Sequence, residues 1–323
     1  RHYKARRERG TLAPKPNMAE NKGICGKLFN QQPMPAKMNL KNYFKEARKG
    51  GWAIGQFNFS DLKVLEAIVL AAKKMRSPVI LGTSEGESKS IGLKQAVSLV
   101  KAFREESGLP IFLNLDHGKS LEYIREAIDA GYDAVHFDGS SLPLDENIRI
   151  AKEVVLYGRK KKVFIEGEVG VIRGSSEIHK EKVAVAEEDL TDPAEALKFI
   201  RETKIDNLAV NIGLFHGIAL SGKKPDINFQ RLKEIKNKTE DRAGLVLHGG
   251  SGVPEEDVKR AIKLGIVKIN INTELRLAFT GALKEVLRDF PEENTSYKYM
   301  PRVVRAVQEV VESKIQLFGS KNR

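Results

Sequence analysis

The feature that most constrains the fold is a regular alternation of short apolar segments with longer segments of helical periodicity. The apolar segments are rich in β-branched residues and have the length of buried strands. The predicted strands cover residues 52–57, 78–83, 110–115, 134–137, 162–165, 207–212, 245–247 and 267–271. A predicted helix follows each strand, over residues 62–75, 93–106, 121–130, 144–157, 194–202, 229–236, 255–264 and 274–288. Apolar strands that are each followed by a helix are typical of parallel strands covered on both faces.

Eight such units over about 240 residues match the size of a closed barrel. We therefore predict an α/β protein with a (β/α)8 TIM barrel and extra N- and C-terminal helices, and an open doubly wound sheet is the alternative. The extra helices are predicted near Leu40–Ala47, which Gly50 and Gly51 follow, and over Arg302–Phe318. The chain has 323 residues, 41% of them hydrophobic, which is enough for one large core.

Basic residues are concentrated in the N-terminal region. Residues 1–37 contain nine Lys or Arg and only two Glu, and the whole chain has a net charge of +12. This region has neither periodicity nor the apolar stretch of a secretory signal. We therefore expect a basic, disordered extension over 1–37 before a single domain over 38–323. An arm that binds nucleic acid or a membrane surface is the less favoured alternative.

Membrane spans and disulfides are not expected. The chain has no run of 18 apolar residues, which a membrane-spanning helix would require. Cys25 is the only cysteine, which excludes an internal disulfide and fits a cytoplasmic location. We accordingly expect neither a nucleic-acid partner nor a membrane partner.

Three histidines follow predicted strands, and each lies next to a glycine. Asp116 and His117 follow the third strand, His216 the sixth and His248 the seventh. The carboxyl ends of the strands in a TIM barrel share the face where active sites lie. A catalytic zinc takes three protein ligands and keeps one open position. Each histidine alone is better explained as a hydrogen-bonding residue, but together they predict a zinc site with Asp116 beside it.

Other polar residues also lie at strand ends. Asp138 and Glu168 could bind a second cation or orient the ligands of the first. His136 lies inside a strand, where a core hydrogen bond is favoured over a role in the site. The GGSG sequence at 249–252 precedes a helix and suits an anion such as phosphate. No lysine ends a strand, and Lys268 is near the start of the last one, so a Schiff-base route lacks a nucleophile.

Six motifs resemble the class II, zinc-dependent fructose-bisphosphate and tagatose-bisphosphate aldolases, from about Asn39 to the C-terminus. They are LDHG (115–118), EGEVG (166–170), NIGLFHG (211–217), KKPDINFQRLKEI (223–235), LVLHGGSG (245–252) and NINTEL (270–275). The resemblance implies a cytoplasmic lyase of glycolysis and gluconeogenesis that cleaves a ketose bisphosphate into dihydroxyacetone phosphate and a phosphorylated aldehyde. It also implies one catalytic Zn2+, a second metal site, a monovalent cation, and a homodimer or homotetramer.

The resemblance further implies a role for each matched residue. The zinc ligands would be His117, His216 and His248, and Asp116 would protonate the aldehyde oxygen in the condensation direction. Asp138 and Glu168 would form the secondary metal site. Arg302 would reach the distal phosphate of a substrate bound to a neighbouring subunit. The substrate would contact Asn58, Ser84, Gly217, Gly249, Gly250, Ser251, Asn270, Asn272 and Thr273.

Two departures from the family pattern bear on substrate choice and activity. After strand five, relatives carry a glycine pair and adjacent acidic residues, whereas this chain reads GVIRGSSEIHKEK, with Ser175 and Ser176 at those positions. Glu177 is the nearest carboxylate and the candidate for proton transfer, and a solvated loop charge is its alternative. Relatives also carry a lysine soon after HG, a role left here to Lys223 or Lys224.

The sequence therefore predicts a zinc-dependent fructose 1,6-bisphosphate aldolase. A tagatose-bisphosphate or other ketose-bisphosphate aldolase is the first alternative. A non-catalytic barrel that binds sugar phosphates is the second, because the acidic pair is missing.

Overall fold

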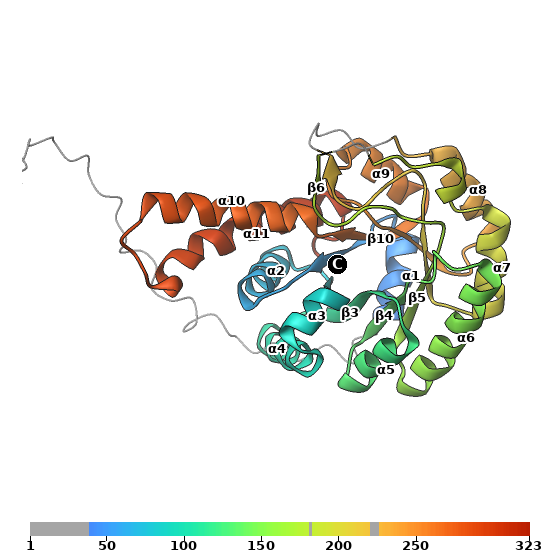
Figure 1. Cartoon of the computed structure of the whole chain (residues 1–323), viewed down its shortest axis with the longest axis horizontal. Helices are drawn as coiled ribbons and strands as arrows, with labels where there is room; N and C mark the ends of the chain where they lie inside the picture. The colour runs from blue at the N-terminus through green and yellow to red at the C-terminus, as the bar shows by residue number, and fades with distance from the viewer. Residues whose placement is uncertain (1–38, 181–182, 220–225) are drawn as a thin grey trace, which may run out of the picture. The chain divides into compact units, whose positions relative to one another are not determined.

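Eight parallel strands close into a barrel in the order β1-β10-β9-β7-β5-β4-β3-β2 (Figure 1). The computed structural model describes residues 39–180, 183–219 and 226–323, so the predicted extension over 1–37 and both Lys223 and Lys224 lie outside the described residues. The barrel strands are β1 Ile54–Asn58, β2 Val79–Ser84, β3 Ile111–Gly118, β4 Ala134–Phe137, β5 Phe164–Val169, β7 Asn207–Val210, β9 Gly244–Leu247 and β10 Ile266–Ile271. The predicted TIM barrel is confirmed, and the open sheet is excluded.

The predicted helices are present, and side-chain caps fix several of their starts. Asp61 accepts hydrogen bonds from the backbone of Lys63 and Val64 at the start of α2, and Ser120 and Asp192 cap α5 and α7. The helices are α1 Leu40–Gly50, α2 Leu62–Met75, α4 Leu93–Ser107, α5 Leu121–Ala130, α6 Leu144–Lys161, α7 Pro193–Thr203, α8 Phe229–Thr239, α9 Glu255–Lys263, α10 Thr273–Asp289 and α11 Ser296–Phe318.

The sequence pattern did not indicate four short elements. The helix α3 (Glu85–Ile91) lies directly after β2, and a 3-10 turn covers Glu187–Asp189. The strands β6 (Ile178–His179) and β8 (Ile218–Ala219) pair in parallel outside the barrel. They join the connections that follow β5 and β7, so two loops from neighbouring barrel strands support each other.

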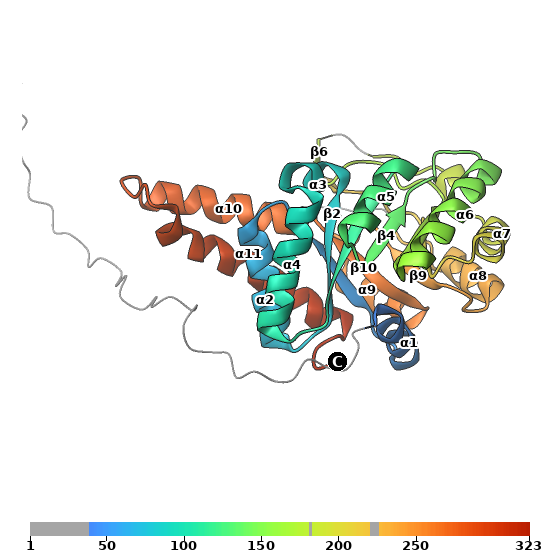
Figure 2. The ribbon, with the colours of Figure 1, turned by 90° about the horizontal axis from the view of Figure 1, so that it is seen from below.

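The helix α1 packs at the amino end of the barrel. Phe44 on α1 lies against Phe164 at the start of β5, with 4.9 Å between the ring centroids. Both belong to an apolar cluster that also contains Trp52 and Phe112. Figure 2 shows α1 at one end of the strands and α3 and β6 at the other. Apolar side chains therefore pack between α1 and the amino ends of the strands.

Along β3 the buried residues that share one face become polar toward the carboxyl end. On β3, the positions two residues apart are Phe112, Asn114 and Asp116, and all three are buried. The Asn114 side-chain amide donates to Gln56 Oε1 of β1 at 2.8 Å. These two polar side chains thus pair across strands inside the barrel, as buried polar groups generally do.

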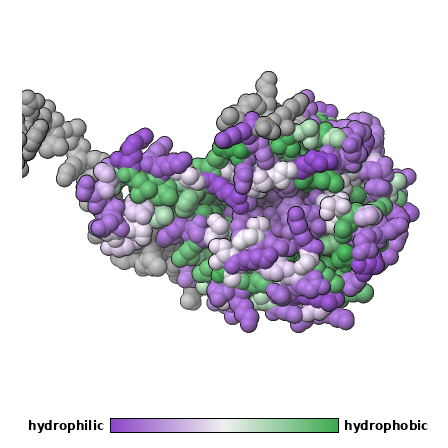
Figure 3. Space-filling view, viewed as in Figure 1, coloured by the Kyte–Doolittle hydropathy of each residue, from purple (hydrophilic) through white to green (hydrophobic). Residues whose placement is uncertain are grey.

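The helices α10 and α11 extend from the barrel as an arm (Figure 1). Leu277, Leu287 and Tyr297 on this arm are exposed, and Figure 3 shows hydrophobic surface there. Among the described residues, no helix combines the length and apolarity that crossing a membrane would require.

Candidate active site

Asp116 lies at the carboxyl end of β3, between two side-chain amides. Its Oδ2 accepts from Asn58 Nδ2 at 2.9 Å, and its Oδ1 accepts from Asn270 Nδ2 at 3.0 Å. Burial would raise the pKa of Asp116, but positive charge on His117, with smaller contributions from other basic neighbours, holds it well below the ordinary range. Asp116 is therefore an ionised, firmly oriented carboxylate.

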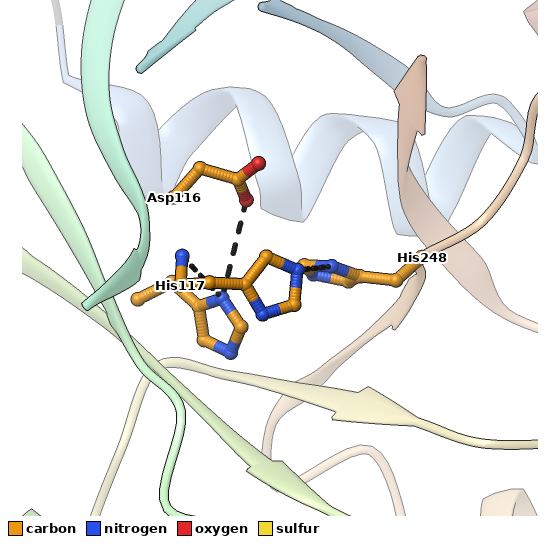
Figure 4. A group of neighbouring side chains, drawn as sticks. Asp116, His117 and His248 are labelled. Atoms are coloured by element: carbon orange, nitrogen blue, oxygen red, sulfur yellow. Dashed lines mark hydrogen bonds and ion pairs between the residues drawn. The ribbon is translucent and has the colours of Figure 1, made fainter. Parts of the chain in front are cut away.

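His117 follows Asp116 in an unusual backbone conformation. Its φ of +52° lies in the left-handed region, which residues other than glycine rarely adopt. Backbone strain of this kind is common at functional sites. The His117 ring lies 4.6 Å from the His248 ring, centroid to centroid. Figure 4 shows Asp116 and His117 approaching from β3 and His248 from the end of β9.

One ring nitrogen of His117 lies close to one ring nitrogen of His248. His248 Nδ1 and His117 Nε2 are 2.9 Å apart. The other nitrogens point to carboxylates, because His117 Nδ1 lies 2.9 Å from Asp138 Oδ2 and His248 Nε2 lies 2.9 Å from Glu166 Oε1. Metal-binding histidines are typically oriented by carboxylates in this way. Two imidazole nitrogens at this separation require a proton or a cation between them.

The surrounding donor set also fits a divalent cation. The possible ligand atoms of Asp116, His117, His136 and His248 lie within 4.8 Å of one another, as do those of His117, Asp138 and Glu168. His136 Nε2 and Glu168 Oε2 are 3.3 Å apart but have no hydrogen bond, either to each other or within the described part of the chain. Imidazole and carboxylate ligands suit zinc and related first-row metals.

The buried carboxylates around His117 favour positive charge in the site. Burial would lower the pKa of His117, but Asp116, Asp138 and Glu168 outweigh burial and raise it to about 10. Burial and the neighbouring histidines lower the pKa of His248 well below its ordinary value. Without a metal, the His117 imidazolium therefore supplies the positive charge among these carboxylates, and a metal ion would replace its proton.

The sequence left two possibilities open for His136, a core hydrogen bond and a place in the site, and the structure shows both. Its Nδ1 accepts from the backbone N–H of His117 at 3.2 Å, which is the predicted core hydrogen bond. It also belongs to the first group of potential ligands, so it lies at the site as well.

His216 lies beside the cluster. Its ring centroid is 4.7 Å from that of His117 and 5.9 Å from that of His248, and it belongs to neither group of potential ligands. Its backbone is held on both sides, because its N–H donates to the Arg173 carbonyl and its own carbonyl accepts from His179 Nε2. Its role as the third zinc ligand stays a prediction.

A cavity of about 280 Å³ opens over these residues at the carboxyl end of the barrel. Gly249, with φ of +64°, has no room for a side chain, because a Cβ there would lie 2.5 Å from the Phe215 carbonyl oxygen. Gly250 is not among the lining residues, and its N–H donates to the Asn270 carbonyl. The predicted site residues that line the cavity are Asn58, Ser84, Asp116, His117, Asp138, Glu177, His216, Gly217, Gly249, Ser251, Asn270, Asn272 and Thr273.

Glu177 lies on the loop that precedes β6, together with Ser175 and Ser176. All three line the cavity. The Glu177 carbonyl accepts from the Ile218 N–H at 3.0 Å, which ties this loop to the segment after His216. Glu177 is thus close enough to be a candidate, and its proton-transfer role stays a prediction.

Arg302 lies on α11 and does not line the cavity of its own chain. Its Nη1 is 3.3 Å from Asp289 Oδ2, and its guanidinium lies over the Phe290 ring. Its predicted role therefore requires a second copy of the chain.

Sequence reasoning missed a network centred on Glu87. Glu87 Oε2 accepts from Asn58 Nδ2 at 3.0 Å and from the Ser84 N–H at 2.8 Å. Glu87 Oε1 accepts from Arg276 Nη2 at 2.6 Å, and Arg276 Nη1 donates to the Ser176 carbonyl at 3.1 Å. Ser84 and Glu87 form a capping box at the start of α3, and their Ser-x-x-Glu spacing was the available signal.

The side chain of Lys268 reaches further than its place in the strand suggests. It is low on β10, as its sequence position indicates, but its long side chain carries Nζ to within 2.7 Å of Glu166 Oε2. Lys268 is only 2% exposed, and Glu166 also contacts His248. The amine therefore reaches the layer beneath the histidines, where the carboxylate of Glu166 neutralises its charge.

Known proteins share this barrel fold. The family model described as class-II fructose-bisphosphate aldolase matches residues 38–323. The YdjI aldolase from Escherichia coli K12 is 30% identical, with a TM-score of 0.75 and coverage of 88% of this chain and 97% of that chain. A candidate fructose-1,6-bisphosphate aldolase from Coccidioides immitis is 28% identical, with a TM-score of 0.74 and coverage of 87% and 96%.

A third solved structure shares the fold. The fructose-bisphosphate aldolase of Campylobacter jejuni is 21% identical, with a TM-score of 0.75 and coverage of 88% of this chain and 94% of that chain. Since the family model spans the whole barrel and the 30% identical aldolase is covered almost completely, this chain belongs to the class II fructose-bisphosphate aldolase family.

Proposed function

We propose that the protein is a zinc-dependent aldolase that reversibly cleaves fructose 1,6-bisphosphate into dihydroxyacetone phosphate and glyceraldehyde 3-phosphate. The observation that carries the proposal is the convergence of Asp116, His117 and His248 beneath one cavity, which Asp116 and His117 line, with each histidine oriented by a carboxylate. We assign the zinc to His117, His216 and His248, and a second cation site to Asp138 and Glu168.

Asp116 is the proposed acid–base residue. Cleavage of the C3–C4 bond requires loss of the proton on the C4 hydroxyl, and condensation returns it to the aldehyde oxygen. An ionised carboxylate fixed by Asn58 and Asn270 can accept that proton without reorienting. A bound divalent cation would stabilise the enediolate as a Lewis acid. Glu177 is the proposed group for proton transfer at the enediolate carbon.

The cavity wall offers groups for a phosphorylated substrate. Gly249, Ser251 and Thr273 line it near the first turn of α10 and would contact the dihydroxyacetone phosphate moiety. Lys119 and Arg276 line the same cavity and add positive charge. These groups support a bisphosphate substrate.

Another ketose bisphosphate, such as tagatose 1,6-bisphosphate, is the second candidate. The observation that favours it is the loop at the cavity, where Ser175 and Ser176 replace the expected acidic pair. The same replacement is the basis of the third candidate, a barrel that binds sugar phosphates without turnover.

The arm supports the proposed homodimer or homotetramer. Leu277, Leu287 and Tyr297 are exposed on it, and a second copy would cover them and could bring its Arg302 to the neighbouring cavity. Sedimentation analysis would test the assembly. The proposed setting is the cytoplasm, in glycolysis and gluconeogenesis, without nucleic-acid or membrane partners.

The test is a cleavage assay of zinc-loaded protein on the two bisphosphates at equal concentration. We expect faster cleavage of fructose 1,6-bisphosphate, loss of activity with EDTA, and recovery with zinc. Preference for the C4 epimer would establish the second candidate. Binding of dihydroxyacetone phosphate without turnover of either substrate would establish the third.

A further inference from the structure

A second cavity, of about 450 Å³, lies at the amino end of the barrel, away from the proposed active site. Its apolar wall contains Phe44 of α1 and Phe164 of β5, which close this end of the barrel. Ile200 and Ile205, at the end of α7 and just beyond it, also line it. Its volume is in the range of small-molecule sites, and the proposed aldolase reaction uses none of its residues.

The rim of this cavity is strongly basic. Two acidic side chains, Asp206 and Asp241, lie among the lining residues. The basic lining residues are Lys41, Lys45, Arg48, Arg159, Arg201, Lys204 and Arg242. Seven cations around one concave surface raise the local positive potential and attract anions.

Only some of these basic side chains form an ion pair or a hydrogen bond with the rest of the chain. Lys41 Nζ lies 3.3 Å from Asp206 Oδ1. Arg48 and Arg159 donate to the backbone carbonyls of Asp241 and Lys204, just beyond the ends of α8 and α7. Arg242 pairs with Glu240. Among the described residues, the side chains of the remaining three have neither an acidic partner nor a hydrogen bond: Lys45, Arg201 and Lys204.

A buried amide provides an independent sign of a ligand. Asn207, at the start of β7, lines the cavity and is 1% exposed. Its Nδ2 has no hydrogen-bond partner within the described part of the chain. Its Oδ1 faces Gly244, where a Cβ would lie only 2.2 Å away. Buried amide donors are nearly always satisfied, so this donor in a residue of the cavity wall still lacks an acceptor.

We propose that this cavity binds a small anion that carries two phosphoryl groups. The donors on its wall are an amide N–H, ammonium groups and guanidinium groups, which match phosphoryl oxygens. Among the described residues, five of the seven cations have no acidic partner, and their summed charge exceeds that of one phosphate, which favours two phosphoryl groups. The apolar wall of Phe44 and Ile200 would contact a carbon skeleton. Binding here is independent of aldolase chemistry, because the cavity lies at the opposite end of the barrel.

The test is calorimetric titration of the full chain with inorganic pyrophosphate. The double variant Lys45→Glu/Arg201→Glu reverses two rim charges without altering the core. The control Lys94→Glu/Lys284→Glu makes the same change in net charge at exposed positions on α4 and α10. We expect the rim variant to bind pyrophosphate at least about tenfold more weakly, and the control to bind within about twofold of the wild type.

A third variant, Asn207→Asp, tests the buried donor, with circular dichroism to confirm folding. We expect it to weaken pyrophosphate binding as well, because an acceptor replaces the donor at nearly constant size. Inhibition assays identify pyrophosphate bound at the active site instead, because that binding competes with fructose 1,6-bisphosphate. Equal affinities in the rim variant and the control would overturn the proposal. So would absence of binding to the wild type, or a binding event that only Arg276→Ala removes.

Discussion

The amino and carboxyl halves of the barrel are built from the same strands but have opposite contents. On β3, Phe112 near the amino end packs in the apolar cluster with Phe44, whereas Asp116, four residues further on, lies among the histidines. Both side chains are buried, at 3% and 7% exposure. The comparison shows that one strand can provide stability at one end and chemistry at the other.

The buried charged groups of the polar half would destabilise the fold if they had no partners. Buried carboxylates are unfavourable unless they are paired. Glu166 is paired twice, with Lys268 and with His248, at 2.7 and 2.9 Å. Burial and Asp138 raise the pKa of Glu168, whose Oε2 has no hydrogen bond among the described residues. We therefore expect changes in the polar half to affect activity first, and changes in the apolar half to affect stability first.

The largest effect is expected from Asp116→Ala. Loss of a positioned acid–base group typically lowers turnover by about 10²–10⁴-fold, and we expect the upper part of this range. Stability should change little, because Asn58 and Asn270, which lose their partner, line the cavity and can bond to water there. Turnover and thermal unfolding of the same preparation would check both. Retention of more than about a tenth of the turnover would remove Asp116 from the mechanism.

Phe112→Ala is the counterpart on the same strand. Removing a buried phenyl ring costs about 3–5 kcal/mol of unfolding free energy. Turnover per folded molecule should stay near the wild-type value. Denaturant unfolding and an assay below the transition would separate the two effects. If turnover instead fell with stability unchanged, the division between the two halves would be wrong.

Glu87→Gln should have an intermediate effect. The amide keeps the size of the side chain but loses the charge that holds Arg276, and it places a donor opposite Asn58 or the Ser84 N–H. We expect kcat/KM to fall by about tenfold, which corresponds to the loss of one charge-assisted hydrogen bond. The exposed Glu122→Gln is the matched control. Equal kinetics in the two variants would show that Glu87 acts only as a helix cap.

Tyr132, in the core outside the barrel, should matter least to activity. Its hydroxyl lies 2.9 Å from Thr83 Oγ1, and burial raises its pKa to about 12. The unfolded tyrosine titrates near 10, so folding stability should fall as the pH rises from about 10 to 12. Tyr132→Phe should cost about 1 kcal/mol at neutral pH and reduce this alkaline loss. Denaturant midpoints at several pH values would measure both, and an unchanged alkaline slope would contradict the assignment.

The sequence predicted the barrel well because every strand and helix carries its own local signal. Apolar runs marked all eight strands to within a few residues, and the helices α2 and α5 have their predicted bounds. The proximity of Asp116, His117 and His248 was predictable for a geometric reason. The carboxyl ends of barrel strands meet at one face, so residues far apart in the chain become neighbours there.

The remaining features depend on side-chain reach and tertiary contacts. Glu87 and Arg276 come together only in the folded chain, because α3 follows β2 and α10 follows β10 at the same end of the barrel. Lys268 reaches Glu166 because its side chain extends from one layer of the barrel to the next. The orphaned amide of Asn207 has no sequence signature, because its lack of a partner is a property of the packed structure.

The most direct test of the account is the number of divalent metal ions bound per chain. Protein purified with added zinc would be analysed by plasma mass spectrometry, beside His117→Ala and His248→Ala variants shown to be folded by circular dichroism. We predict that the wild type retains at least one tightly bound zinc ion per chain and that each variant loses one. Full retention of zinc by both variants, or fructose 1,6-bisphosphate cleavage by metal-free wild type, would contradict the account.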